Sequence, residues 1–165
     1  MTFSPMPIPS RLTETEIEYL LKLLRLHFAY PLAYPLSGAY FEELFSAAVH
    51  GMREKRKRLF DVLRNGTGWS LKTLQWPILA PETSFEVVIQ RCDIFRNPGL
   101  SLDSPIVALG RQVLHQFNSF CEESAVAQGV SDPRAAFLLR ERTGLHFSLF
   151  QRRYRLFSAD EVEWR

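Results

Sequence analysis

The sequence predicts a single α/β domain in which a mixed β-sheet is flanked by helices. Its length of 165 residues is about that of one domain. Helical apolar periodicity near the start and again after residue 104 alternates with short β-rich runs, which is the pattern of that class. At 46% hydrophobic and 23% charged, the composition excludes collagen-like and wholly disordered chains. We expect a flexible arm over residues 1–12, which is proline-rich, and the domain over 13–165.

Two helices are expected at the start of the domain. The first spans about 14–29, because Thr13 and Glu16 have capping-box spacing and leucines follow at helical period. Two prolines then end it. The second spans about 38–52, and its inner stripe consists of Phe41, Leu44, Phe45 and Ala48.

A β-hairpin follows the second helix. Residues 58–63 and 69–76 are short apolar or β-rich runs, and the Asn-Gly-Thr-Gly segment 65–68 between them is a strong turn signal. We therefore expect two antiparallel strands joined by a four-residue loop. The clearest single strand in the sequence is 85–92.

A long helix and two more strands complete the expected order. Ser104 is a suitable helix cap with Pro105 at the first helical position, and Gly129 is placed to end the helix after Gln128. The apolar residues between them recur at helical spacing. Two final strands are expected at 135–140 and 147–157, linked around Thr143-Gly144.

Charge and cysteine content limit the partners and the setting. The net charge is only +2, but arginines and lysines cluster at 53–58 and arginines again at 140–155. Such clusters either hold a polyanion or form solvated faces. No apolar run approaches a membrane span, and the N-terminus does not resemble a secretory signal. Two cysteines, Cys92 and Cys121, are expected to be buried free thiols, which favours a reducing, cytoplasmic setting.

One group of polar residues is expected to come together in the fold and could form a functional site. Ser70 and Lys72 are two positions apart, so on a strand they point to the same face, about 6–7 Å from each other. The hairpin brings Asp61 beside them on the neighbouring strand. Glu42 or Glu43 on the second helix is expected to reach the same place. The ordinary alternative is a cross-strand ion pair between Asp61 and Lys72 on an exposed sheet face.

These residues resemble the PD-(D/E)XK superfamily of restriction-endonuclease-like nucleases. Segment 38–42 resembles its glutamate-bearing helix, Phe60-Asp61-Val62 its aspartate strand, and 68–73 its (D/E)-x-K strand. The similarity extends over about 38–128. It implies hydrolysis of DNA phosphodiester bonds with Mg²⁺, or Mn²⁺ as a substitute. It also implies a type II restriction enzyme acting as a homodimer.

The resemblance assigns roles to individual side chains. Asp61 is the expected metal ligand with Glu42 or Glu43, and Lys72 is the expected catalytic lysine. Ser70 departs from the pattern, because the family usually has its second acid there; Glu86, or Glu82, is the expected replacement. Basic side chains then neutralise DNA phosphates, and those singled out are Arg56, Arg58, Arg91 and Arg153.

Two alternatives stay open at this point. The first is a catalytically inactive nucleic-acid-binding or assembly module on the same fold, which Ser70 favours. The second is a small interaction protein that uses no nucleic acid. Its partner surface would be the apolar first helix, with Leu20, Leu21 and Leu24.

Overall fold

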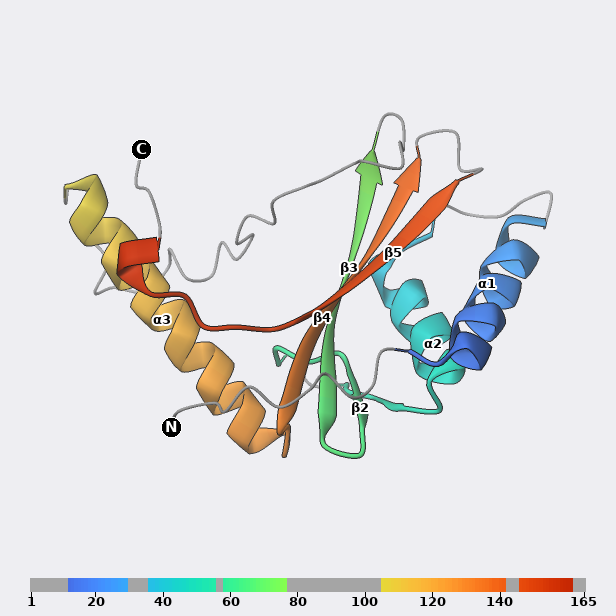
Figure 1. The fold of residues 1–165 in the computed structure, drawn as a ribbon, viewed down its shortest axis with the longest axis horizontal. Helices are drawn as coiled ribbons and strands as arrows, with labels where there is room; N and C mark the ends of the chain where they lie inside the picture. Colours follow the sequence, from blue (N-terminus) through green and yellow to red (C-terminus); the bar gives the residue numbers. More distant parts are fainter. Residues whose placement is uncertain (1–11, 30–35, 56–57, 77–104, 142–145, 162–165) are drawn as a thin grey trace.

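A five-stranded mixed sheet with helices on both of its faces forms the centre of the molecule (Figure 1). The computed structural model describes residues 12–29, 36–55, 58–76, 105–141 and 146–161. The elements are α1 (Glu14–Ala29), α2 (Gly38–Ala48), β1 (Met52–Arg53), β2 (Val62–Arg64), β3 (Thr67–Trp76), α3 (Ile106–Ala127), β4 (Asp132–Glu141), β5 (Phe147–Arg153) and the 3-10 turn η2 (Ala159–Glu161). The predicted single-domain α/β class is confirmed. The arm 1–11 and the strand predicted at 85–92 lie outside the described residues.

The strands lie in the order β1-β2-β3-β4-β5, and only one neighbouring pair is parallel. β3 runs parallel to β4 over its whole length, from the pair Thr67–Asp132 to the pair Trp76–Glu141. The other pairs are antiparallel. A parallel pair requires a long crossover connection, and α3 lies in the segment that joins β3 to β4.

Helix α1 begins as its capping box predicts. The Thr13 N–H donates to Oε2 of Glu16 at 2.8 Å, and the Glu16 N–H donates to Oγ1 of Thr13 at 3.3 Å. Two N–H groups that an isolated helix end leaves without partners are thereby satisfied. The predicted bounds 14–29 agree with the structure.

Helix α2 is shorter than predicted, because it ends at Ala48 and not at Met52. His50 adopts a left-handed conformation with φ of +50°. Its N–H donates to the Ala47 carbonyl at 3.3 Å, and the Gly51 N–H donates to the Ser46 carbonyl at 2.8 Å. This is the Schellman arrangement, which stops a helix and satisfies its last carbonyls.

The hairpin between β2 and β3 has a two-residue turn, so the predicted four-residue loop is wrong. Arg64 pairs directly with Thr67. Asn65 and Gly66 between them have φ values of +48° and +78°. Positive φ at both central positions defines the type I′ turn, whose twist matches that of the strands it joins.

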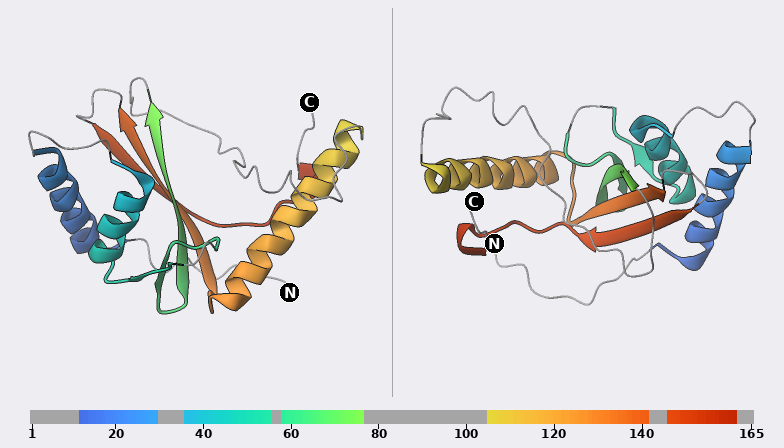
Figure 2. Two further views of the ribbon diagram at one scale, coloured as in Figure 1. Left: turned by 180° about the vertical axis from the view of Figure 1, so that it is seen from behind. Right: turned by 90° about the horizontal axis from the view of Figure 1, so that it is seen from above.

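Two apolar cores lie on opposite faces of the sheet (Figure 2). Helices α1 and α2 cover one face, where Phe45 packs edge-on against Trp69 with ring centroids 5.7 Å apart. Trp69 is fully buried, and at roughly 25 cal/mol per Å² an indole of this size is among the largest contributors to the core. The second core joins Leu59 and Phe60 to Phe117 and Cys121 of α3. Cys121 is buried and its sulfur is in no disulfide, as predicted, whereas Cys92 lies outside the described residues.

The last strands differ from their predicted bounds at one end each. β4 begins at Asp132, three residues earlier than predicted, because it pairs with the first residue of β3. β5 ends at Arg153 and not at Phe157. Beyond it, Asn118 of α3 exchanges two hydrogen bonds with the backbone of Phe157, at 2.8 and 3.3 Å. The chain therefore leaves the sheet to cover α3. Gly129, with φ of +63°, follows the end of α3 as predicted.

Candidate functional site

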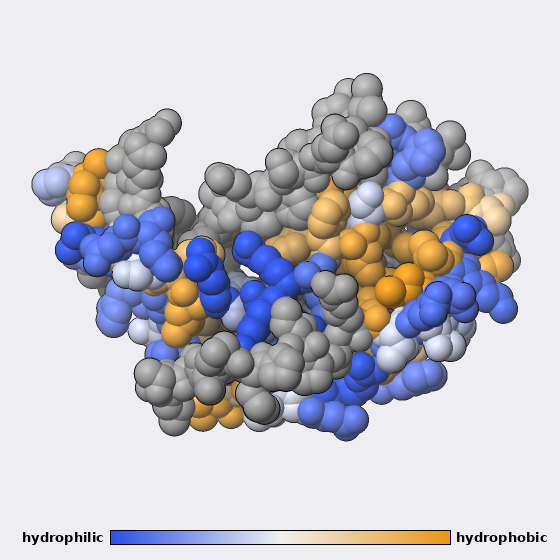
Figure 3. Space-filling model, viewed as in Figure 1, coloured by the Kyte–Doolittle hydropathy of each residue, from blue (hydrophilic) through white to orange (hydrophobic). Residues whose placement is uncertain are grey.

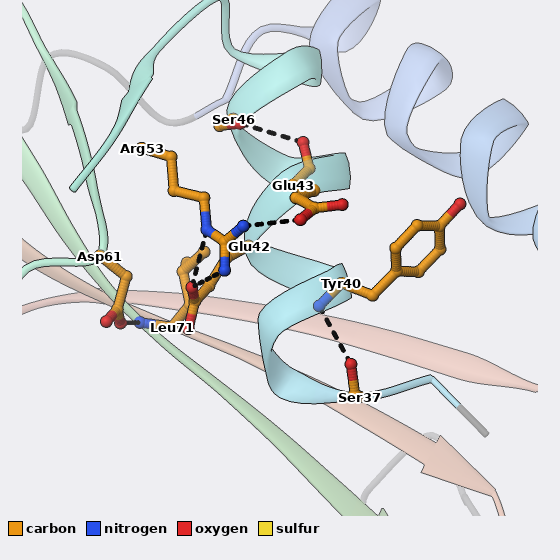
Figure 4. Close-up of polar contacts among 8 residues, drawn as sticks. All are labelled: Ser37, Tyr40, Glu42, Glu43, Ser46, Arg53, Asp61 and Leu71. Carbon is orange, nitrogen blue, oxygen red and sulfur yellow. Dashed lines mark hydrogen bonds and ion pairs between the residues drawn. The ribbon is translucent and has the colours of Figure 1, made fainter. Parts of the chain in front are cut away.

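Asp61 lies where β2 and β3 separate. The last residue pair of this ladder is Val62 with Trp69. The Asp61 N–H still donates to the Trp69 carbonyl at 2.8 Å. Its carboxylate then accepts the next N–H along β3, that of Leu71, at 2.7 Å (Figure 4). The side chain therefore takes the place of a backbone acceptor and holds the carboxylate against the edge of β3.

Lys72 reaches the same edge of β3. Its ammonium Nζ donates to the Leu71 carbonyl at 2.9 Å. The N–H and C=O of one extended residue point to the same side of the strand, so Asp61 and Lys72 bind adjacent groups of that residue. The sequence prediction brought these two charges together, and the structure places them along one edge.

Ser70 shares the face of Lys72, because side chains alternate along a strand. Trp69 and Leu71 belong to the core under α1 and α2. Ser70 and Lys72 therefore point to the opposite face. Ser70 is buried, with 3% of its surface exposed, whereas Lys72 is exposed.

Glu42 and Glu43 are both bound to Arg53. The Arg53 guanidinium contacts Oε2 of Glu42 at 3.1 Å through two nitrogens, and Oε1 of Glu43 at 2.6 Å. Figure 4 shows the guanidinium beside both carboxylates, with Asp61 at the backbone of Leu71. The structure thus gives these glutamates a counter-ion in β1, which the sequence analysis did not foresee.

Among the residues that the structure describes, no group of three His, Cys, Asp or Glu side chains is arranged to hold a metal ion. Magnesium usually keeps several waters and needs only one or two carboxylates. Asp61 supplies one, and the Arg53 contacts with Glu42 use Oε2 alone. Glu82 and Glu86 lie outside the described residues. Asp61 and Glu42 are thus carboxylates of the kind that magnesium binds, but the described residues do not complete a metal site.

The expected DNA contacts are distributed unevenly. Arg56 and Arg91 lie outside the described residues. Arg58 is half-buried, and Arg153 is exposed at the last position of β5. Alternation along β5 points Arg153 toward the face of α1 and α2, and Arg152 toward the face of Lys72. Sequence reasoning placed Arg152 in the late arginine cluster but could not assign its face, because that face depends on the register of three strands.

The apolar surface predicted on α1 is mostly core. Leu20 and Leu24 are buried, with 2% and 3% of their surface exposed, whereas Leu21 is 41% exposed. The helical period that suggested a partner surface is therefore explained by packing onto α2 and the sheet.

The fold and the site define a single-domain α/β protein, whose described residues form three α-helices, a mixed sheet and a charged pair at one strand edge. Comparisons with protein-family models, curated proteins and solved structures gave no match to this chain. In the part of the chain that the structure describes, no helix has the length and apolar character needed to span a membrane.

Proposed function

We propose that this protein is a Mg²⁺-dependent DNA endonuclease related to the PD-(D/E)XK nucleases. The observation that carries the proposal is the convergence of Asp61 and Lys72 on the backbone of Leu71. An acid directly before β2 and a lysine on β3, after a glutamate-bearing helix, follow the order of the family pattern. A type II restriction enzyme working as a homodimer is the specific form that we infer.

The roles of the side chains follow from their chemistry. Asp61 would bind the cation, and its hydrogen bond from Leu71 fixes the direction of the carboxylate. The bound Mg²⁺ polarises the phosphate and lowers the pKa of a water molecule. The Lys72 ammonium offsets negative charge that builds on the scissile phosphate and orients the attacking water. Because Lys72 holds only a backbone carbonyl, it can turn to a phosphate without breaking an ion pair among the described residues.

Because Ser70 stands where the family usually has its second acid, the second carboxylate ligand must come from elsewhere, and there are two candidates. Glu42 would bind through the oxygen that Arg53 leaves uncontacted. Glu86 would instead replace the acid missing at Ser70, as the sequence suggested. Manganese binding by Glu42→Gln and Glu86→Gln variants, measured by calorimetry, identifies the ligand as the one whose loss weakens binding.

Plasmid cleavage tests the proposal directly. We expect the purified protein to nick or linearise supercoiled DNA in Mg²⁺ and to be inactive in EDTA. Discrete fragments would indicate a restriction enzyme, and a smear a nuclease without sequence preference. Lys72→Ala should reduce the cleavage rate by about 10²-fold or more. Lys22→Ala is the matched control, since Lys22 is an exposed lysine of α1 outside the basic clusters. Equal cleavage by the wild type and the Lys72 variant would refute the site.

A catalytically inactive DNA-binding module is the second candidate. Two observations favour it: a buried serine stands at the acid position, and a guanidinium already neutralises Glu42. Such a module would bind DNA without cutting it and would show no heat of Mn²⁺ binding. Cation-dependent cleavage that Lys72→Ala abolishes would exclude it.

A further inference from the structure

We propose that DNA is bound on the sheet face that bears Lys72, by a patch in which the exposed Arg152 and Phe150 make the contact and the buried Phe137 lies beneath the Arg152 guanidinium. The inference rests on the proposed function in one respect, that the ligand is DNA. It assigns the contact to strands β4 and β5, beyond the edge where Asp61 lies. Phe137 and Phe150 were not among the site residues expected from sequence, whereas Arg152 belongs to the arginine cluster at 140–155 noted there.

Strand register places the patch on the same face as Lys72. Lys72 pairs with Phe137, which pairs in turn with Phe150. One row away, Ser70 pairs with Ala135, which pairs with Arg152. Paired residues point to the same face of a sheet. Neighbouring strands are about 4.8 Å apart, so Arg152 lies two strands from Ser70, roughly 10 Å across the sheet.

Lys72 and Arg152 are exposed cations without a carboxylate partner in the part of the chain that is described. Two other arginines of the sheet differ in this respect. Arg64 is paired with Glu16, and Arg134 is buried and paired with Asp132 at 2.7 Å. A cation already neutralised by a carboxylate gains little from a phosphate. The cations left for a polyanion on this face are therefore Lys72 and Arg152.

The patch combines the Arg152 guanidinium with two phenylalanine rings. The Arg152 guanidinium lies over the Phe137 ring, 5.6 Å from its centroid. A guanidinium held over an aromatic face can keep its N–H donors available for bidentate binding of a phosphate. Phe150 beside it is 37% exposed, which is unusual for a phenylalanine in a paired strand. Figure 3 shows hydrophilic surface where β5 ends, beside an apolar area over the sheet.

The geometry points to a contact with the sugar-phosphate backbone and not with base edges. Arginine reads guanine only when it enters a groove, whereas the Arg152 guanidinium lies over the Phe137 ring of the sheet. Exposed phenylalanine stacks on sugars or splayed bases without sequence preference. At about 3.4 Å of helix rise per nucleotide, the roughly 10 Å across the sheet between the β3 and β5 positions corresponds to about three nucleotides. The patch would therefore hold the strand on one side of the scissile phosphate.

The test measures binding of a fluorescein-labelled DNA duplex by anisotropy in EDTA over a series of salt concentrations. We expect Arg152→Ala to weaken binding roughly 3- to 10-fold and to reduce the slope of log K against log salt by about one. Phe150→Ala should weaken binding with an unchanged slope, because the ring carries no charge. Arg152→Lys should keep the slope. Arg25→Ala, which removes an exposed arginine of α1, is the matched control and should bind like the wild type.

The outcomes separate this inference from the proposed function. Binding that depends on Arg152 in a protein that never cleaves DNA would support the patch and refute the nuclease. Cleavage by a protein whose Arg152→Ala variant binds with unchanged affinity and slope would refute the patch alone. Equal losses in the Arg152 and Arg25 variants would also refute it, since binding would then follow overall charge. Melting curves of each variant confirm that its fold is retained.

Discussion

The Asp61 carboxylate and the Lys72 ammonium are bound to the two backbone polar groups of a single residue, Leu71. A carboxylate on the N–H and an ammonium on the C=O leave that part of the β3 edge satisfied by side chains. The Asp61 carboxylate and the Lys72 ammonium are thereby held close to each other, although Asp61 and Lys72 are not a paired couple in the β2–β3 register. The local geometry also gives each charge a measurable structural role, which can be separated from its chemical role.

Asp61→Asn and Asp61→Ala should separate these two roles of the aspartate. The asparagine oxygen can still accept the Leu71 N–H, so we expect the free energy of unfolding to fall by about 1 kcal/mol or less. Alanine leaves that N–H without its side-chain acceptor, and we expect a loss of about 1–3 kcal/mol. Both variants should lose DNA cleavage, because both remove the negative charge.

Urea denaturation and plasmid cleavage, measured on the same preparations, check this prediction. An asparagine variant that cuts DNA at the wild-type rate would contradict the metal-binding role. An alanine variant as stable as the asparagine variant would contradict the structural role of the hydrogen bond.

Arg53→Met should reveal whether Glu42 takes part in the site. The change removes the guanidinium from both glutamates, and because Arg53 is 34% exposed, we expect a stability change below about 1 kcal/mol. Manganese affinity should rise several-fold, since a competing cation is gone. Adding Glu42→Gln to this background should abolish the gain, whereas Glu43→Gln should leave most of it. Calorimetric titration measures the affinity, and equal values in all three variants would exclude Glu42 as a ligand.

Local signals in the sequence were sufficient for much of the fold. The capping box of Thr13 and Glu16 fixed the start of α1, and the Asn65-Gly66 pair located the hairpin. Those signals involve residues close in sequence and depend on backbone chemistry alone. The length of the hairpin loop was mispredicted because Thr67 was grouped with the turn although it pairs with Arg64.

Relationships between distant residues could not be predicted in the same way. Glu42 was expected beside Asp61, but Arg53 of β1 binds it, and this contact depends on the Schellman end of α2 at His50. That end carries histidine where glycine is the usual signal. The face of Arg152 likewise follows from the β3–β4 register, which joins segments far apart in the chain. Convergence of Asp61 with Lys72 was predictable because one hairpin sets it.

Glu16→Gln should make the protein less stable at neutral pH and less sensitive to acid. Burial raises the pKa of the Glu16 carboxyl, but the hydrogen bonds from Arg64 and from the Thr13 N–H outweigh it and leave the pKa below its ordinary value. A lowered pKa in the folded state stabilises the protein above the pKa of the unfolded state, near 4.3. This contribution is lost as the pH falls through the folded-state pKa.

The free energy of unfolding, measured from pH 7 to pH 3, tests whether the stabilisation by Glu16 is lost as the pH falls. The difference between the wild type and Glu16→Gln should be about 1 kcal/mol at pH 7 and should shrink toward pH 3. Glu18→Gln, an exposed position of the same helix, is the control. A difference that stays constant, or that grows in acid, would rule out the ion pair between Glu16 and Arg64 as its source.

Gly66→Ala should destabilise the hairpin more than Gly129→Ala destabilises the end of α3. Both glycines have positive φ, +78° and +63°, so a side chain at either position is strained by about 1–2 kcal/mol. At Gly66 an added Cβ would also lie 2.8 Å from Oγ of Ser131, whereas at Gly129 it would meet nothing within 4 Å. We therefore expect Ser131→Ala to recover part of the Gly66→Ala loss and none of the Gly129→Ala loss. Urea denaturation of the single and double variants measures this coupling, and additive losses would show that backbone strain alone makes Gly66 necessary.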